Sequence, residues 1–202
     1  NGRAIDYPRG KVLGGCSSIN GMIYMRGQAR DYDQWAQLGN PGWGWDDVLP
    51  YFLKSEDNLA LEPSDLHARG GEWRIEKPRI SWEILDAFMD AAVEAGLPRV
   101  DDFNTGNNEG VGYFHVNQKR GWRWNTSRGF LKPVRNRRNL RIVTGAHTKR
   151  VKIEDGKATG IVFDLGGIEQ VASALSEVIL AAGAVASPTI LQLSGIGPGE
   201  AL

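Results

Sequence analysis

The stretch Arg9-Gly-Lys-Val-Leu-Gly-Gly-Cys-Ser-Ser-Ile-Asn20 sets paired glycines beside small hydroxyl side chains. Glycine has no Cβ, so its backbone can approach a flat ring or a phosphate closely. Taken alone, this stretch is equally consistent with a flexible turn. A second stretch of the same character lies near the other end, Gly183-Ala-Val-Ala-Ser-Pro-Thr-Ile-Leu-Gln-Leu-Ser-Gly-Ile-Gly197. Together they predict one cofactor that is contacted from two directions.

Composition narrows the class of protein. The chain has 202 residues, 41% hydrophobic and 24% charged, which is typical of a soluble globular protein. Its 24 basic and 24 acidic side chains cancel, so charge gives no reason to expect a nucleic-acid partner. No apolar run approaches the ~18 residues of a membrane-spanning helix, and no transmembrane segment is predicted.

The only cysteine, Cys16, excludes an intrachain disulfide and a four-cysteine zinc site. Its presence alone weakly favours a reducing compartment, so we predict a cytoplasmic protein and leave peripheral membrane attachment open. His67, His115 and His147 are widely spaced and predict no metal site. Each is expected to be structural or exposed.

Hydrophobic periodicity predicts helices over 31–38, 46–56, 81–95 and 126–137. In the third of these, an apolar stripe is formed by Ile84, Leu85, Phe88, Ala92 and Ala95. Residues 57–71 are polar and read as an exposed loop, and short strands are predicted over 72–76 and 113–117. The tryptophan pairs could form an aromatic cage, but packing of helices and turns is the favoured interpretation.

The last third of the chain changes to strand patterns. Strands are predicted over 140–144, 147–154, 158–164, 169–172 and 177–182, with turns at Asp155-Gly156 and Gly166-Gly167. The last is a buried strand that ends at Gly183, and a helix then runs from Ser187 to Leu193. A strand, a glycine and a helix in this order place a helix N-terminus against an anion. Gly195–Gly199 is expected to be the turn that ends the helix.

These residues resemble a known family. Gly10–Asn20, followed by Tyr24, Gly27 and Asp33, is similar to the first signature of the glucose–methanol–choline (GMC) oxidoreductases, and Gly183–Gly197 resembles the second. Cys16 departs slightly from the usual Ser, Thr or Gly. Intervening residues also fit the family spacing: Asp102-Phe-Asn104, Gly110-Val-Gly112, Arg123 and Arg138-Asn-Leu140.

The resemblance implies an FAD-dependent enzyme that oxidises an alcohol to a carbonyl, by hydride transfer to flavin N5 after a base removes the hydroxyl proton. Choline or another primary alcohol is the implied substrate, and the electron acceptor is unknown. It implies cofactor contacts from Val12, Gly14, Gly15, Ser17, Asn20, Gly21, Met22, Ile23, Thr148, Gly183 and Ala184. Ile19 stands where some members carry a flavin-linked histidine, so the FAD is predicted to be non-covalent.

The family base is a histidine in a context that this sequence does not contain, so no catalytic residue is predicted. The predicted architecture is an α/β fold, a partial FAD/NAD(P)-binding-type domain with an inserted α+β substrate-side segment. Residues 1–57 and 139–202 form the FAD-binding parts, and residues 58–138 form the insertion. We expect an internal piece of a longer polypeptide that is inactive alone. The alternatives are a truncated, non-catalytic FAD-binding chain and a non-redox lyase of the same family.

Overall fold

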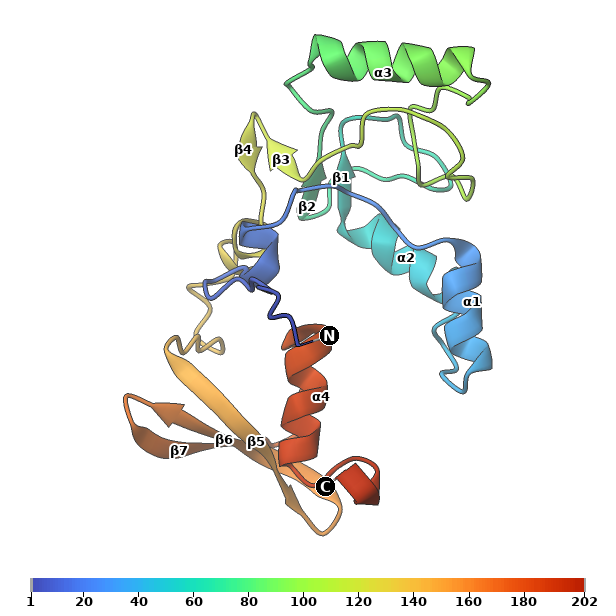
Figure 1. The fold of residues 1–202 in the computed structure, drawn as a ribbon. Coiled ribbons are helices and arrows are strands. Elements are labelled where there is room, and N and C mark those ends of the chain that lie inside the picture. Colours follow the sequence, from blue (N-terminus) through green and yellow to red (C-terminus); the bar gives the residue numbers. More distant parts are fainter. Residues whose placement is uncertain (1, 202) are drawn as a thin grey trace. The chain divides into compact units, whose positions relative to one another are not determined.

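The computed structural model describes residues 2–201, which form two compact units that divide between Leu140 and Arg141 (Figure 1). Unit 1 precedes this division and unit 2 follows it. Both helices and strands are present, as the predicted α/β class requires. The division into an insertion between two FAD-binding parts concerns function and stays a prediction. Among the described residues, no helix is long and apolar enough to span a bilayer.

The first two α-helices of unit 1 pack through aromatic rings. Helix α1 (Ala29–Gln37) and helix α2 (Trp45–Ser55) lie where helices were predicted. The Tyr32 ring centroid is 5.4 Å from that of Trp35 and 5.7 Å from that of Phe52. Asp33 accepts a hydrogen bond from the Trp45 backbone N–H at 2.9 Å, which ties the start of α2 to α1. Trp43 and Trp45 therefore pack against neighbouring aromatic rings as predicted, whereas Trp122 of the other tryptophan pair is 69% exposed.

Short strands form the centre of unit 1. Strand β1 (Glu56–Asn58) pairs in parallel with β2 (Trp73–Ile75), and β3 (Gln118–Lys119) pairs with β4 (Trp122–Arg123) as a hairpin. The prediction of an exposed loop over 57–71 is wrong, because Asn58 and His67 are buried. Their polar atoms are hydrogen-bonded to other buried polar groups. The polar composition of this segment therefore did not mean that it is exposed to solvent.

Helix α3 (Glu83–Glu94) confirms the third predicted helix (Figure 1). Gly96, with a left-handed φ of 95°, terminates the helix two residues after Glu94, and the Leu97 N–H donates to the Ala92 carbonyl at 3.0 Å. Ile84 is 75% exposed and Phe88 66% exposed, whereas Met89 is buried. Periodicity therefore predicted the helix, while the face that packs depends on which neighbours are present.

Two predicted elements of unit 1 are replaced by less regular structure. Residues 113–117 make only isolated bridges within the described chain, where Val116 pairs with Ile23 and with Glu76. The predicted helix over 126–137 is a single π-helical turn, η2 (Ser127–Leu131), followed by turns. Pro133 lacks the N–H that would continue the helical hydrogen bonds, which accounts for the early end.

Unit 2 is an antiparallel sheet with a helix beside it (Figure 1). Strands β5 (Ala146–Glu154), β6 (Lys157–Leu165) and β7 (Ile168–Ser173) pair in sequence order. Both predicted two-residue turns are confirmed, with positive φ at all four residues. Helix α4 (Gly183–Leu193) packs on β5, and the Val151 N–H of β5 donates to Ser194 Oγ at 2.8 Å. The core is Val151, Val162, Phe163 and Ile190.

Three predictions in unit 2 are wrong. Residues 140–144 and 177–182, both described by the structure, form no strand. Ile179 is 77% exposed, because no described segment lies beside this apolar run to pair with it. Helix α4 begins at Gly183 rather than at Ser187, and the Ala182 N–H is satisfied by Ser187 Oγ at 3.0 Å. A Schellman turn at Gly195 ends the helix as predicted, and a 3₁₀ turn, η3 (Gly199–Ala201), follows.

Candidate functional site

The glycine-rich stretch of unit 1 folds as a tight loop around a single 3₁₀ turn, η1 (Gly15–Ser18). Gly14 and Gly15 have φ values of 95° and 52°, a left-handed conformation that glycine adopts at little cost. The Gly15 N–H donates to the Val12 carbonyl at 2.8 Å, and Ser17 Oγ donates to the Gly14 carbonyl at 2.5 Å. A Cβ added at Gly10 would overlap the Gly15 carbonyl. The glycines are therefore required by the course of the loop itself.

A distant segment holds this loop in place. Thr126 donates its backbone N–H to Ser17 Oγ at 3.0 Å, and its hydroxyl donates to the Gly14 carbonyl at 3.3 Å. Asn125 Nδ2 donates to Ser18 Oγ at 2.8 Å. Arg123 Nη1 donates to backbone carbonyls of the same loop. We call Arg123, Asn125 and Thr126 the loop clamp. More than 100 residues of sequence separate the clamp from the loop.

The end of the loop is an Asx turn. Asn20 Oδ1 accepts from the Met22 backbone N–H at 3.0 Å, and Met22 has a left-handed φ of 64°. The Met22 carbonyl accepts from the Asn117 N–H at 2.7 Å, and Tyr24 N–H donates to the His115 carbonyl at 2.9 Å. The segment around Val116 therefore fixes the far end of the loop to the rest of unit 1.

The outer side of the loop is uncovered backbone flanked by apolar side chains. A Cβ added at Gly15 or Gly21 would meet no atom within 4 Å. Val12 is 57% exposed, and Ile19 and Ile23 are each 50% exposed. Such an apolar surface next to bare amides fits a planar heterocycle with polar edges. A flat ring could therefore approach the backbone at Gly15 and Gly21 without meeting another part of unit 1.

Unit 2 contains a hollow of about 390 Å³ between β5 and the first turns of α4. Its lining is small and apolar apart from a few polar groups: His147, Thr148, Ala182, Val185, Ala186, Thr189, Ile190 and Leu193. Thr148 and the start of α4, which the sequence placed separately on one ligand, therefore lie around one cavity. Gly183 and Ala184 are the first two residues of α4, next to lining residue Ala182.

The first N–H groups of α4 have no side-chain cap within the described chain. Unpaired N–H groups and the helix dipole favour a negative charge at this end. No acidic residue stands in the first turn to supply that charge. The hollow therefore joins an apolar wall for a ring to a helix end suited to a phosphate.

A buried ionic network stabilises the segment that follows the loop. Glu56, which is fully buried, pairs with Arg26 at 3.0 Å and with His67 at 3.0 Å, and it accepts the Ala68 N–H at 2.7 Å. His67 Nε2 lies 2.8 Å from Asp102. Burial alone would lower the pKa of His67, but its two carboxylate partners outweigh burial and raise that pKa to about 9.

The carboxylates of this network shift in the opposite direction. Burial by itself would raise the pKa of Glu56, and the hydrogen bonds and positive charges of its partners bring that pKa below its usual value. The pKa of Asp102 is lowered in the same way by His67 and by the Asn104 N–H. The network is therefore charged at neutral pH, and its role is to hold three chain segments together.

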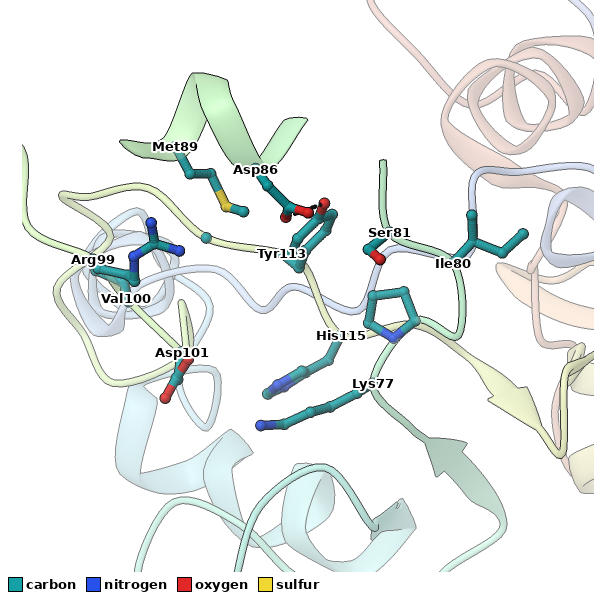
Figure 2. Close-up of a pocket in the computed structure, with 12 residues that line it drawn as sticks. Lys77, Ile80, Ser81, Asp86, Met89, Arg99, Val100, Asp101, Tyr113 and His115 are labelled. Carbon is teal, nitrogen blue, oxygen red and sulfur yellow. Dashed lines mark hydrogen bonds between the residues drawn. The ribbon is translucent and has the colours of Figure 1, made fainter. Parts of the chain in front are cut away.

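Unit 1 also contains a hollow, of about 240 Å³, which lies beneath α3 (Figure 2). Figure 2 shows Lys77 and His115 side by side, with Asp101 across from them. Burial lowers the pKa of His115. Tyr113 donates to Asp86 at 2.8 Å on the opposite wall. None of the predicted cofactor residues lines this hollow, and its mixed charges select no ligand class.

The predicted site residues thus fall into two groups, one in each unit. Val12, Gly14, Gly15, Ser17, Asn20, Gly21, Met22 and Ile23 form one continuous loop, and Thr148, Gly183 and Ala184 lie at or beside the hollow of unit 2. Sequence reasoning noted the spacing of Arg123 but missed what it does, and it missed Asn125, Thr126 and the Glu56 network. Nothing local to those residues signals a partner that is distant in the sequence.

Comparison with known proteins identifies the family. The sequence profile described as GMC oxidoreductase matches residues 1–201. The chain is 41% identical to the oxygen-dependent choline dehydrogenase of Rhizobium etli, over all of this chain and 36% of that protein. It is also 41% identical to the alcohol dehydrogenase [acceptor] of Pseudomonas putida, over 98% of this chain and 36% of the relative.

Solved structures agree. The chain superposes on pyridoxine 4-oxidase from Mesorbium loti with a TM-score of 0.86 and 35% identity, covering 95% of this chain and 38% of the other. An FAD-dependent oxidoreductase from Chaetomium thermophilum gives a TM-score of 0.90 at 33% identity, covering 98% and 37%. The chain spans little more than a third of the length of these relatives. By sequence profile, by identity and by structure, this chain belongs to the GMC oxidoreductase family.

Proposed function

We propose that this chain forms the FAD-contacting part of an enzyme that oxidises an alcohol to a carbonyl. The observation that carries the proposal is the loop of unit 1, which offers bare glycine backbone and exposed apolar side chains in a conformation fixed from outside the loop. The names of the relatives supply the chemical class, since they are choline and alcohol dehydrogenases and a pyridoxine oxidase.

Residues of both units would hold the cofactor. Asn20, Gly21, Met22 and Ile23 would lie along the isoalloxazine ring, with Val12, Gly14, Gly15 and Ser17 shaping the loop beneath them. The backbone of Thr148 would contact the adenine, and the start of α4 at Gly183 and Ala184 would lie near the rest of the ADP portion. Bound FAD would accept the hydride that leaves the alcohol carbon. The role of this chain is to bind, orient and shield that ring.

The cofactor would be bound without a covalent link, because Ile19 offers no nucleophile. Acid precipitation of the purified holoprotein should then release all flavin into the supernatant. Flavin that stays with the pellet would contradict this part of the proposal. The alcohol is a small primary alcohol such as choline, and the electron acceptor is left open.

A pair of substitutions tests whether one FAD is contacted by both units. Gly21→Val adds atoms where the chain leaves open space, and Ala186→Phe fills the hollow of unit 2. Each should leave the apoprotein folded and weaken FAD binding by at least tenfold, as measured by quenching of flavin fluorescence. Gly199→Val, also at an open glycine, is the matched control and should leave affinity unchanged.

Turnover is tested with the polypeptide as its gene encodes it. Reduction of an artificial dye should be observed with choline or another primary alcohol. Bound FAD without reduction of the flavin by any alcohol would favour the non-redox alternative. The proposal is refuted if the full-length protein shows no bound-flavin spectrum, either as purified or after FAD is added.

A further inference from the structure

We infer that Arg123 is a positioning residue for the cofactor, and that it acts by fixing which way the Asn20 carboxamide faces. The inference rests on the proposed function for the identity of the ligand. The contacts that carry it belong to unit 1 alone and exist without the cofactor.

Arg123 converges on the end of the loop with a single nitrogen. Its Nη1 lies 3.2 Å from the Ser17 carbonyl, 2.7 Å from the Asn20 carbonyl and 2.9 Å from Asn20 Oδ1. All three partners are oxygen acceptors, and a guanidinium is always a donor because it does not lose its proton at physiological pH. The atom of the Asn20 side chain that faces Arg123 must therefore be the oxygen.

The same oxygen closes the turn. Asn20 Oδ1 also accepts the Met22 N–H at 3.0 Å, which supports the left-handed backbone of Met22. Two donors, one from Arg123 and one from Met22, thus define the orientation of the carboxamide from both sides. A flipped amide would place its N–H groups against these two donors, and both hydrogen bonds would be lost.

This orientation leaves the other end of the Asn20 side chain with a defined polarity. Asn20 is exposed, and within the described residues its Nδ2 has no hydrogen-bond partner. The carboxamide therefore presents an N–H donor outward at the point where the loop meets its ligand. The complementary ligand group is a hydrogen-bond acceptor on the edge of the ring, such as a carbonyl oxygen or an unprotonated ring nitrogen of the flavin.

Arg123 can be removed without dismantling the loop, because the rest of the clamp remains. Asn125 and Thr126 hold Ser18, Ser17 and Gly14 through hydrogen bonds that do not involve Arg123. The matched control is Arg120, on the same hairpin. Its side chain is exposed and makes no ion pair or hydrogen bond with a described residue. Arg120→Met removes the same charge without touching Asn20.

The first experiment needs no cofactor. Amide hydrogen exchange of Met22 in the apo form of the full-length polypeptide should speed up about five- to tenfold in Arg123→Met, as expected for a weakened turn hydrogen bond. In Arg120→Met it should match the parent. Unchanged Met22 exchange in a folded Arg123→Met variant would overturn the inference whether or not the protein binds FAD.

The second experiment measures FAD affinity and the absorption spectrum of the bound flavin. Arg123→Met should weaken FAD binding about tenfold and shift the visible absorption maxima of the bound flavin, while Arg120→Met changes neither. Combining Arg123→Met with Asn20→Ala should weaken FAD binding no more than Asn20→Ala alone, because Arg123 is inferred to act only through the Asn20 side chain. If the losses of FAD affinity in the two single variants add up in the double variant, Arg123 does not act through Asn20 and the inference is overturned. Failure of the parent protein to bind FAD would instead refute the proposed function.

A further variant covers the case in which Arg123→Met does not fold. Asn20→Asp keeps oxygen acceptors for Arg123 and Met22 but removes the outward donor. It should leave Met22 exchange close to that of the parent and still weaken FAD binding. FAD affinity equal to that of the parent in Asn20→Asp would overturn the claim that this amide N–H is what Arg123 presents.

Discussion

The loop of unit 1 and the hollow of unit 2 reach a similar end by different means. The loop has internal hydrogen bonds, such as that from the Gly15 N–H to the Val12 carbonyl, but polar side chains of the loop clamp hold it in place. The hollow lies between strand β5 and helix α4. The sheet that contains β5 is built from hairpins that are local in the sequence. The loop therefore depends on distant polar partners, whereas the hollow depends on apolar packing of neighbouring elements.

The largest expected effect tests the polar side of this comparison. Glu56→Ala removes a fully buried carboxylate and leaves Arg26 and His67 without their shared partner. An uncompensated buried charge costs about 3–5 kcal/mol. Chemical denaturation should show unit 1 destabilised by this amount and unit 2 unchanged, with hydrogen exchange resolving the two units. Equal destabilisation of both would contradict their description as separate units.

The pH dependence of unit 1 follows from His67. Its pKa in the folded state is about 9, above the ordinary value of 6.5, so its contribution is complete below pH 6.5 and is lost as pH rises through 9. At about 1.4 kcal/mol per pKa unit, the rise from 6.5 to about 9 corresponds to a loss of about 3–4 kcal/mol. Denaturation curves between pH 6 and 10 measure it. His67→Gln should remove most of this slope, and a parent protein that is equally stable at pH 6.5 and 9.5 would refute the assignment.

An apolar truncation tests unit 2. Ile190 is buried between α4 and the sheet, and Ile190→Ala should destabilise unit 2 by about 2 kcal/mol, near the low end for such changes because a small unit can relax around the space. Leu175→Ala is the control, since Leu175 is fully exposed. Thermal unfolding followed by hydrogen exchange of β6 amides distinguishes the two variants. A control as destabilising as Ile190→Ala would contradict the packing described.

The smallest expected effect compares one polar deletion in each unit. Asn125→Ala removes the bond to Ser18 and the one that Asn125 Oδ1 accepts from the Arg128 N–H, and it should loosen the loop by about 1 kcal/mol. Thr189→Val removes only a bond within α4, to the Val185 carbonyl, and should change stability by less than 0.5 kcal/mol. Limited proteolysis measures both effects as cleavage rates in the loop and in α4. Faster cleavage of α4 than of the loop would reverse the comparison.

Sequence reasoning succeeded where the determining contacts are local. The two hairpin turns of unit 2 require left-handed backbone, which Asp155-Gly156 and Gly166-Gly167 supply. The helix ends at Gly96 and Gly195 follow from the same property. The strand over 177–182 failed because strand formation needs a neighbour, and none of the described segments pairs with it. The stripe of α3 is a related case: Ile84 and Phe88 are exposed, since periodicity does not say what covers a face.

By itself the sequence determined the family motifs, the glycine positions, the helices α1 to α3 and the meander β5–β7, because each depends on residues within one turn or one hairpin. Only the tertiary structure decided that residues 123–126 clamp the loop, that Glu56 and His67 are buried ions, and that Thr148 shares a hollow with α4. Those contacts join residues distant in the sequence, and their energy depends on distance and burial, which the order of residues does not encode.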